Sequence, residues 1–228
     1  MRYLIAETSW ATMELAQDLS GTGPLVTRTD RPEDLQHFLR LGGLDLVVLD
    51  AAQLGRDGVS LPALRHGAPS VPVALVAAST DPRQVSHWLE AGADMVITPD
   101  MPLAEVSARL LALARRAHGR GTETLRYGAL QIDLRRRRVT LRETPVKLSP
   151  KVYEILEYLS LRPGRLVTRS ELLGHVYGYE NEPDSRVFDV YMCNLRACLT
   201  TAEGVDIETV RGAGFRFSVR GGDAALAA

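Results

Sequence analysis

The side chains best suited to do chemistry lie between Ser185 and Phe217. Arginine, tyrosine and asparagine recur there at helical intervals, and a basic stretch with two glycines follows after a short polar gap. Asparagine and arginine can each form two hydrogen bonds with the edge of a base, and arginine also binds phosphate. These residue types in this order indicate recognition of DNA.

A helix over Ser185–Leu199 is predicted because apolar residues recur at intervals of three and four. The residues expected to form its apolar stripe are Val187, Val190, Leu195, Cys198 and Leu199. The polar side chains that fall outside this stripe are Arg186, Tyr191, Asn194 and Arg196. Such a helix can bury one face in its own domain and present the other face to the major groove.

Two short strands within Ile207–Phe217 are predicted to flank a glycine-bearing turn with Arg211 at its tip. An arginine in that position can reach the minor groove beside the helix. A polar recognition helix followed by a basic hairpin is the arrangement of a winged helix-turn-helix. We therefore expect Arg211 to contact DNA together with the polar face of the helix.

Length and composition bound the remaining possibilities. The chain has 228 residues, 45% of them apolar, which is enough for two domains of ordinary size. It has no run of 18 apolar residues and no leader-like start, so neither a membrane span nor export is expected. Cys193 and Cys198 lie five apart on one predicted helix, where they are not expected to form a disulfide. These features fit a cytoplasmic protein.

The first half alternates predicted strands and helices. The strands are Arg2–Ala6, Leu25–Thr27, Leu46–Asp50, Val73–Ala77 and Met95–Thr98. The helices are Trp10–Leu19, Pro32–Leu41, Val59–Arg65, Pro82–Ala91 and Leu103–His118. This alternation predicts an α/β domain with a doubly wound, five-stranded parallel sheet in the flavodoxin-like order. Functional groups in such a sheet gather at the carboxyl ends of the strands, and Asp50 stands at one of them.

The second half is predicted to be a smaller α+β domain that follows a linker at 119–124. Its short strands are expected within Leu125–Val146, and its helices are Pro150–Ser160, Arg169–Tyr177 and Ser185–Leu199. We therefore assign 1–118 to a regulatory and dimerisation domain and 125–220 to a winged helix-turn-helix domain. The small alanine-rich tail, 221–228, is expected to be disordered.

Charge is divided unevenly between the two halves. Residues 1–120 hold 11 arginines and no lysine against 14 acidic residues, a net −3, and residues 121–228 hold 16 basic against 14 acidic residues, a net +2. DNA affinity must then come from individually placed arginines rather than from a bulk field. The run Arg135–Arg138 is one candidate contact, although four like charges in a turn are more often a solvated surface.

No enzymatic activity, cofactor or metal is expected. The five histidines are scattered without the spacing of metal ligands. The sequence also lacks a phosphate-binding loop, a dinucleotide fingerprint and a nucleophile elbow.

Both halves resemble response regulators of the OmpR/PhoB class along essentially the whole chain. The family's motifs occur in order and spacing at 148–159, 166–173, 189–196 and 209–217. Segments such as His175-Val-Tyr-Gly are most similar to the CtrA-like cell-cycle regulators of alphaproteobacteria. The resemblance places Val187 and Cys193 on the DNA-reading face, puts Tyr177 near a phosphate, and adds Thr209 to the DNA-contacting residues.

The first half resembles a receiver domain from which several working groups are missing. In the family an acidic pair and a phosphoacceptor aspartate hold Mg²⁺, while a hydroxyl and a lysine bind the phosphoryl group. Here Asp50 matches the phosphoacceptor and Glu7 matches one acidic position, whereas Thr8 replaces the other. The positions of the hydroxyl, the lysine and the switch aromatic hold Ala77, Pro99 and Val96.

These replacements predict a regulator that acts without phosphorylation. A divalent ion would meet the carboxylates of Glu7 and Asp50 where three are wanted, and a phosphoryl group would meet neither lysine nor hydroxyl. Asp50 is then expected to be an unphosphorylated remnant. A conventional phosphorylated switch is one alternative, which the missing groups disfavour. A non-DNA adaptor is another, which Arg211 and the polar helix face disfavour.

The resemblance also implies a homodimer through the fourth helix, fifth strand and fifth helix of the receiver. Asp94, Glu105 and Arg109 match that face, and Trp88 is expected to add apolar area there or to pack inside its own domain. The expected partners are double-stranded DNA and a second copy of the chain. RNA polymerase and a histidine kinase are further candidate partners, and no membrane is expected among them.

Overall fold

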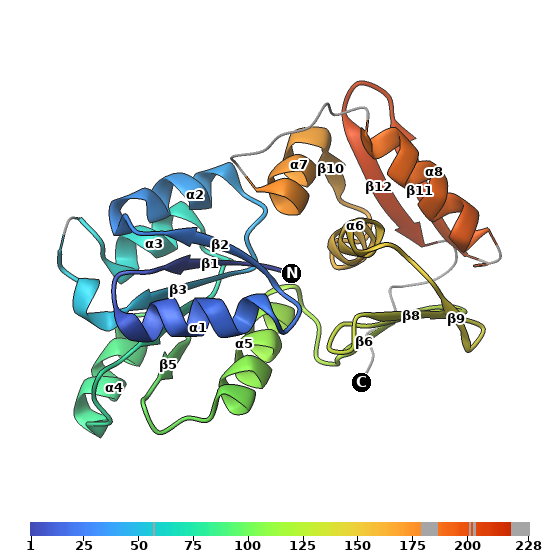
Figure 1. The fold of residues 1–228 in the computed structure, drawn as a ribbon. Coiled ribbons are helices and arrows are strands. Elements are labelled where there is room, and N and C mark those ends of the chain that lie inside the picture. The colour runs from blue at the N-terminus through green and yellow to red at the C-terminus, as the bar shows by residue number, and fades with distance from the viewer. Residues whose placement is uncertain (57, 179–186, 201, 203, 220–228) are drawn as a thin grey trace. The chain divides into compact units, whose positions relative to one another are not determined.

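A computed structural model describes residues 1–56, 58–178, 187–200, 202 and 204–219. The chain divides into two compact units, Met1–Ala117 and His118–Ala228, which are described separately below. Figure 1 labels most of the elements of both. Across the described ranges, no helix is long and apolar enough to cross a membrane.

The first unit is built on a five-stranded parallel sheet. Its strands are β1 (Arg2–Ala6), β2 (Leu25–Thr29), β3 (Leu46–Asp50), β4 (Val73–Val76) and β5 (Met95–Ile97). They lie in the order β2-β1-β3-β4-β5, which is the flavodoxin-like order predicted from the sequence. The residues of β1, β4 and β5 are all buried, as expected for short apolar strands covered by helices on both faces. The fold class predicted for this half is therefore confirmed.

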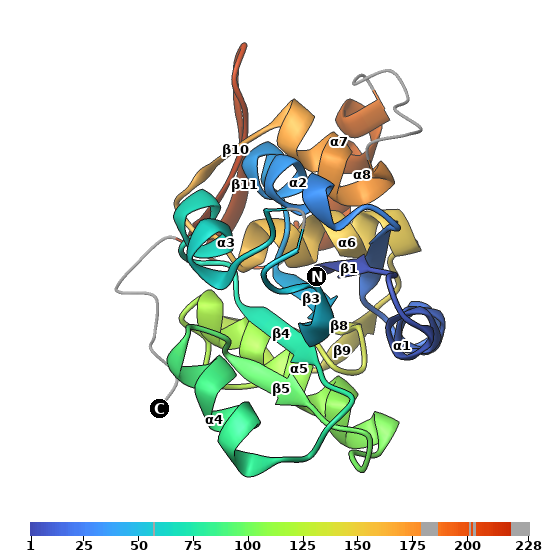
Figure 2. The same ribbon diagram turned by 90° about the vertical axis from the view of Figure 1, so that its left-hand side faces the viewer.

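Helices cover both faces of this sheet, as Figure 2 shows from the side. They are α1 (Trp10–Ser20), α2 (Leu35–Leu41), α3 (Leu61–Gly67), α4 (Pro82–Glu90) and α5 (Leu103–Ala117), with short 3₁₀ turns at Pro32–Asp34 and Ala51–Gln53. One core cluster joins apolar residues of α2 and α3 to the sheet, and Trp88 of α4 packs against it. Helices α1 and α5 contact each other and β3.

In the first unit, two helix starts differ from the prediction for local reasons. The segment Pro32–Leu41 begins as a 3₁₀ turn and becomes α-helical only at Leu35. The third helix begins at Leu61 rather than Val59, because the hydroxyl of Ser60 accepts a hydrogen bond from the backbone N–H of Ala63 and caps the first turn.

The second unit begins with a four-stranded antiparallel sheet and continues into a helical core with a three-stranded sheet. The first sheet contains β6 (Thr124–Tyr127), β7 (Leu130–Asp133), β8 (Arg138–Leu141) and β9 (Thr144–Val146) in sequential order. The helices are α6 (Pro150–Ser160), α7 (Arg169–Tyr177) and α8 (Val187–Leu199). The second sheet contains β10 (Leu166–Thr168), β11 (Val205–Val210) and β12 (Gly214–Val219) in the order β10-β12-β11.

The sequence does not predict strand β10. It has three residues and runs directly into α7, whose N-cap is Thr168. A strand this short has no readable alternation of its own, and its pairing with β12, some 50 residues later, is what defines it. The predicted tail, 221–228, lies outside the described residues.

Candidate nucleic-acid interface and the Asp50 pocket

Helix α8 buries a different face from the one predicted. Its buried residues are Phe188, Met192, Leu195 and Leu199. Val190 is 60% exposed, and Val187 and Cys198 are half-buried, so they do not form the core stripe. Both sets of residues have helical spacing, but the larger side chains of Phe188 and Met192 fill more of the core. The prediction of the apolar stripe was therefore wrong except for Leu195 and Leu199.

The predicted reading residues still lie outside the buried face. Cys193, Asn194 and Arg196 are exposed, and Tyr191 is half-buried. Arg186, which was predicted to contact DNA, lies outside the described residues. The described part of α8 therefore leaves Cys193 and Asn194 accessible, as side chains that contact bases in the major groove of DNA would have to be.

Tyr177 and Tyr191 join the end of α7 to the start of α8. Their hydroxyl oxygens are 2.7 Å apart, and the ammonium of Lys151 lies 4.7 Å from the centre of the Tyr177 ring. Burial, and then the hydrogen bond with Tyr191, raise the pKa of Tyr177 to about 12. The hydroxyl therefore stays protonated at neutral pH. One O–H of the pair can then be donated to an acceptor such as a phosphate oxygen.

Arg196 connects α8 to the hairpin that follows it. Its Nε and Nη2 donate to the backbone oxygen of Ile207 at 2.8 and 2.6 Å, and Nη2 also donates to the hydroxyl of Thr209 at 2.7 Å. Ile207 and Thr209 both belong to β11. Because these donors are already engaged, the geometry favours a positioning role for Arg196 that the sequence did not suggest.

The hairpin of β11 and β12 carries Arg211 at its turn. The two strands pair from Val205 with Val219 to Val210 with Gly214, which leaves Arg211, Gly212 and Ala213 as the connection. Arg211 is exposed, and Gly212 has a φ of +72°, a left-handed conformation that glycine adopts readily. The hairpin thus holds Arg211 in the position expected for a wing.

Gly214 allows β12 to approach β10 closely. A Cβ atom at this position would overlap the backbone oxygen of Val167 and lie 2.9 Å from the Cα of Thr168. Both are backbone atoms paired with β12, so neither can rotate away. The glycine is therefore required by the packing of the wing on its own domain.

The basic run in the turn between β7 and β8 mostly contacts its own unit. Arg136 forms an ion pair with Asp133 at 3.2 Å, and Arg137 lies 3.5 Å from Glu154 and over the ring of Tyr153 at 4.6 Å. These contacts favour the alternative in which Arg135–Arg138 belongs to the ordinary surface.

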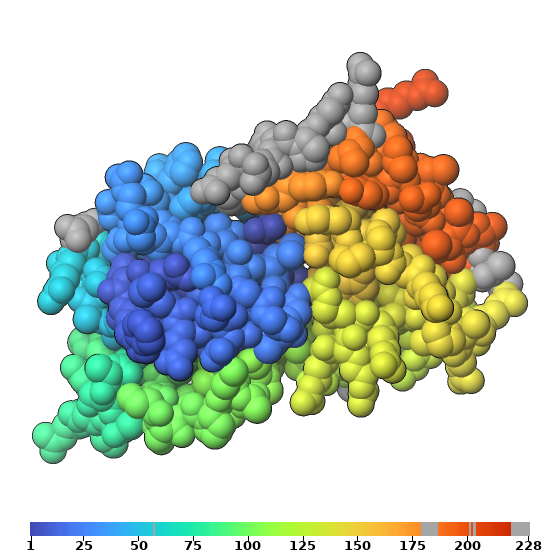
Figure 3. Space-filling model, viewed as in Figure 1, coloured from blue at the N-terminus to red at the C-terminus, as the bar shows by residue number. Residues whose placement is uncertain are grey.

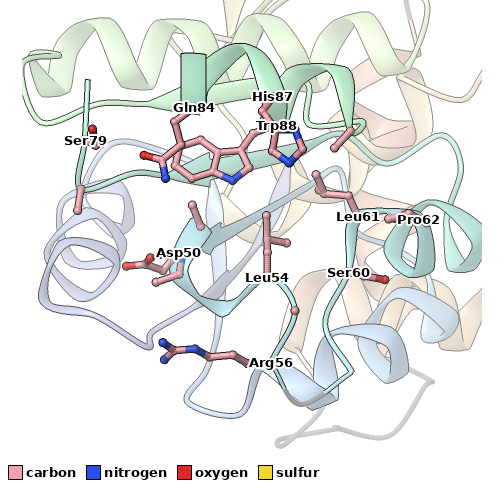
Figure 4. Close-up of a pocket in the computed structure, with 15 residues that line it drawn as sticks. Asp50, Leu54, Arg56, Ser60, Leu61, Pro62, Ser79, Gln84, His87 and Trp88 are labelled. Carbon is pink, nitrogen blue, oxygen red and sulfur yellow. Dashed lines mark hydrogen bonds between the residues drawn. The ribbon is translucent and has the colours of Figure 1, made fainter. Parts of the chain in front are cut away.

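In the first unit, Asp50 ends β3 beside a hollow of about 620 Å³ (Figure 4). Its Oδ1 accepts a hydrogen bond from the backbone N–H of Ala52 at 2.8 Å. Glu7, at the end of β1, lies 3.2 Å from the guanidinium of Arg28. An arginine of the protein thus partly neutralises the acidic side chain that would otherwise face a metal ion.

The remaining receiver positions are occupied by apolar groups. Ala77 and Val96 are buried, at 3% and 6% exposure, and Pro99 is exposed on the loop after β5. Among the residues that the structure describes, no three His, Cys, Asp or Glu side chains come together as metal ligands.

The residues predicted for a dimer contact already have partners in their own unit. Asp94 contacts the guanidinium of Arg65 and accepts a hydrogen bond from the backbone N–H of Val73 at 2.7 Å. Glu105 and Arg109 form an ion pair along α5 at 2.6 Å. Trp88 packs partly buried against the core cluster, which favours the alternative that its main role lies inside the unit.

Comparison with known proteins identifies the family. A family model described as the C-terminal part of transcriptional regulatory proteins matches residues 143–217. The cell cycle transcriptional regulator CtrA of Caulobacter vibrioides is 31% identical over 219 residues, 94% of this chain and 95% of CtrA. The two-component response regulator PhoP of Pseudomonas aeruginosa is 34% identical over 178 residues, 77% of this chain and 79% of PhoP.

The chain belongs to the OmpR/PhoB class of response regulators and is a DNA-binding transcription regulator of that type. Its relatives CtrA and PhoP are regulators rather than enzymes. A solved structure of the response regulator DrrB, an OmpR/PhoB homologue from Thermotoga maritima, has a TM-score of 0.43 and 23% identity to this chain. The alignment covers 95% of this chain and 97% of DrrB.

Proposed function

We propose that this regulator binds DNA without phosphorylation of Asp50. The observation that carries the proposal is the chemical environment of that side chain. Asp50 stands where a phosphoacceptor would stand, yet the groups that make such an aspartate reactive are replaced by Thr8, Ala77 and Pro99.

The metal requirement is the first obstacle to phosphorylation. Mg²⁺ binds proteins through carboxylate oxygens in a near-octahedral shell, and phosphoryl transfer depends on the ion to neutralise developing charge. The carboxylate of Glu7 is paired with Arg28, and Thr8 supplies no negative charge. To bind Mg²⁺ here, Glu7 would have to give up its ion pair with Arg28. The ion would then still have one carboxylate ligand too few, because Thr8 replaces an acidic residue.

The phosphoryl group itself is the second obstacle. It would add a charge of about −1.5 to −2 at neutral pH. The methyl group of Ala77 and the ring of Pro99 can neither donate a hydrogen bond nor supply a positive charge. An unfavourable charge in these surroundings disfavours both formation and retention of a phosphoryl-aspartate.

Acetyl phosphate with Mg²⁺ should give no stable adduct on the full-length protein, because the ion and the phosphoryl oxygens lack their ligands. Intact-mass spectrometry checks this, with a response regulator that has a complete receiver treated in parallel as a control for the reagent. Asp50→Asn should leave DNA affinity within about twofold, since asparagine keeps the size of the side chain and its capacity to cap Ala52. A phosphoryl adduct on Asp50 together with tighter DNA binding would establish the conventional switch instead.

We infer that the second unit places α8 in the major groove and Arg211 in the neighbouring minor groove. Asn194 is exposed on α8 and can read adenine through two hydrogen bonds. The Tyr177–Tyr191 pair is suited to a phosphate next to the start of α8. Cys193, Val187 and Thr209 are proposed to lie within the same contact, as the family resemblance implies.

We further infer a homodimer through α4, β5 and α5 of the first unit. Arg109→Glu should reverse one charge of that face and convert dimers to monomers in sedimentation velocity. The mutation should also weaken binding to a two-site operator more than binding to a single half-site.

Arg40→Glu on α2 is the matched charge reversal outside that face and should leave the dimer intact. Trp88→Ala is a poor test because Trp88 packs on the core. An Arg109→Glu protein that remains dimeric at low micromolar concentration would rule out this interface.

A further inference from the structure

A second cavity of about 550 Å³ shares Asp50 and Ala78 with the hollow of Figure 4 and opens between α1 and the start of α5. Its volume lies within the range of small-molecule sites. It occupies the carboxyl ends of β3, β4 and β5, where ligands of doubly wound sheets bind.

The walls of this cavity are mainly apolar. Ala77, Pro99, Met101 and Leu103 line it, and the indole of Trp10 stands at its edge. Trp10 is 79% exposed and Leu103 is 38% exposed. Helix α1, in dark blue, lies at the surface in Figure 3. A ligand that covered Trp10 and Leu103 would therefore remove apolar area from water.

The charged side chains that line the cavity are all acidic. They are Asp50, Glu14 and Asp18, and within the described part of the chain none of the three forms an ion pair. At the start of α1, the Ser9 hydroxyl accepts a hydrogen bond from the backbone N–H of Thr12. An unpaired carboxylate beside apolar walls favours a cationic ligand.

We propose that this cavity binds a small amine with an apolar body. The ammonium group pairs with Asp50, the apolar body lies against Met101 and Leu103, and Trp10 covers it by ring contact or cation–π attraction. The replacements that remove phosphoryl chemistry also create this site, since lysine at 99 would place a positive charge in it. The ligand would act on the regulator through the unmodified carboxylate of Asp50.

Phenethylamine is a suitable probe, with 2-phenylethanol and 3-phenylpropionate as its neutral and anionic counterparts. The chain has two tryptophans, so in a Trp88→Phe protein the fluorescence reports on Trp10 alone. We expect saturable binding of the amine, with a dissociation constant on the order of 1 mM for so small a ligand. The two counterparts should bind at least about tenfold more weakly, because 2-phenylethanol has no positive charge to pair with Asp50 and the carboxylate of 3-phenylpropionate is repelled by it.

Three substitutions test whether the amine binds in this cavity. Asp50→Asn should weaken phenethylamine binding about tenfold. Leu103→Lys, a surface change that adds a positive charge at the rim, should weaken it as well. Gln84→Ala alters only the hollow of Figure 4 and should have no effect. Equal binding of 2-phenylethanol, or no loss in Asp50→Asn, would overturn the proposal. Because these titrations use unmodified protein, they are independent of whether acetyl phosphate can modify Asp50.

Discussion

Replacing Gly214 by alanine should destabilise the second unit by about 3 kcal/mol or more and abolish specific DNA binding. The added Cβ would overlap the backbone oxygen of Val167, so β10 and β12 would have to separate. Separation of these strands removes the support of the wing and exposes the apolar residues beneath it. Urea unfolding followed by circular dichroism, together with DNA-binding titrations, measures both effects.

Gly212→Ala is the matched control for this prediction. No atom lies within 4 Å of a Cβ built at Gly212, but its φ is +72°, so alanine there is strained without a clash. We expect this substitution to lower the free energy of unfolding by about 1 kcal/mol, with folding and DNA binding retained. If Gly214→Ala were as stable as Gly212→Ala, the close approach of β10 and β12 would not be the constraint that the structure indicates.

Asn194→Ala and Arg196→Ala should impair DNA binding in different ways. Asn194 is proposed to read a base, so its loss should remove about 1–3 kcal/mol of discrimination at one position of the operator and leave other positions unchanged. Arg196 holds β11 through Ile207 and Thr209. Its loss should release the wing from α8 and therefore lower the affinity for all DNA sequences alike.

The salt dependence of binding separates this positioning role of Arg196 from a direct phosphate contact. A side chain that neutralises a phosphate changes the slope of log affinity against log salt by about one when it is removed. We expect the slope for Arg196→Ala to match the wild type. Thr209→Val, which keeps the shape of the side chain but removes the hydroxyl, should show a weaker form of the same defect. A slope reduced by about one in Arg196→Ala would assign Arg196 to a phosphate after all.

The sequence predicts the sheet of the first unit well because its strands are short, rich in apolar residues and regularly alternate with helical segments. Strands β1 and β3 coincide with the prediction at both ends. The signal is strong because the strands are buried on both faces, so that apolar residues run nearly without interruption between the polar residues at their ends, such as Arg2 and Asp50. Helix α1 shows the same clarity, since Ser9 and Thr12 form its capping box.

The face of α8 could not be read as reliably. Val187 and Val190 satisfy helical spacing as well as Phe188 and Met192 do, and only packing against α6 and β11 decides between them. The hydrogen-bond and ion-pair partners of side chains are even harder to predict from the sequence. The bond from Arg196 to Ile207 crosses from one element to the next, and Glu7 meets Arg28 through strand pairing rather than through proximity in the sequence. Periodicity carries no information about either contact.

The most direct measurement is the affinity of unmodified full-length protein for DNA selected by that same protein from a random pool. At about 0.15 M salt we expect a dissociation constant on the order of 10⁻⁸ M, as for specific regulators in general, and no more than a twofold change on adding acetyl phosphate and Mg²⁺. Binding that stays in the micromolar, non-specific range until the phosphodonor is added would contradict phosphorylation-independent recognition.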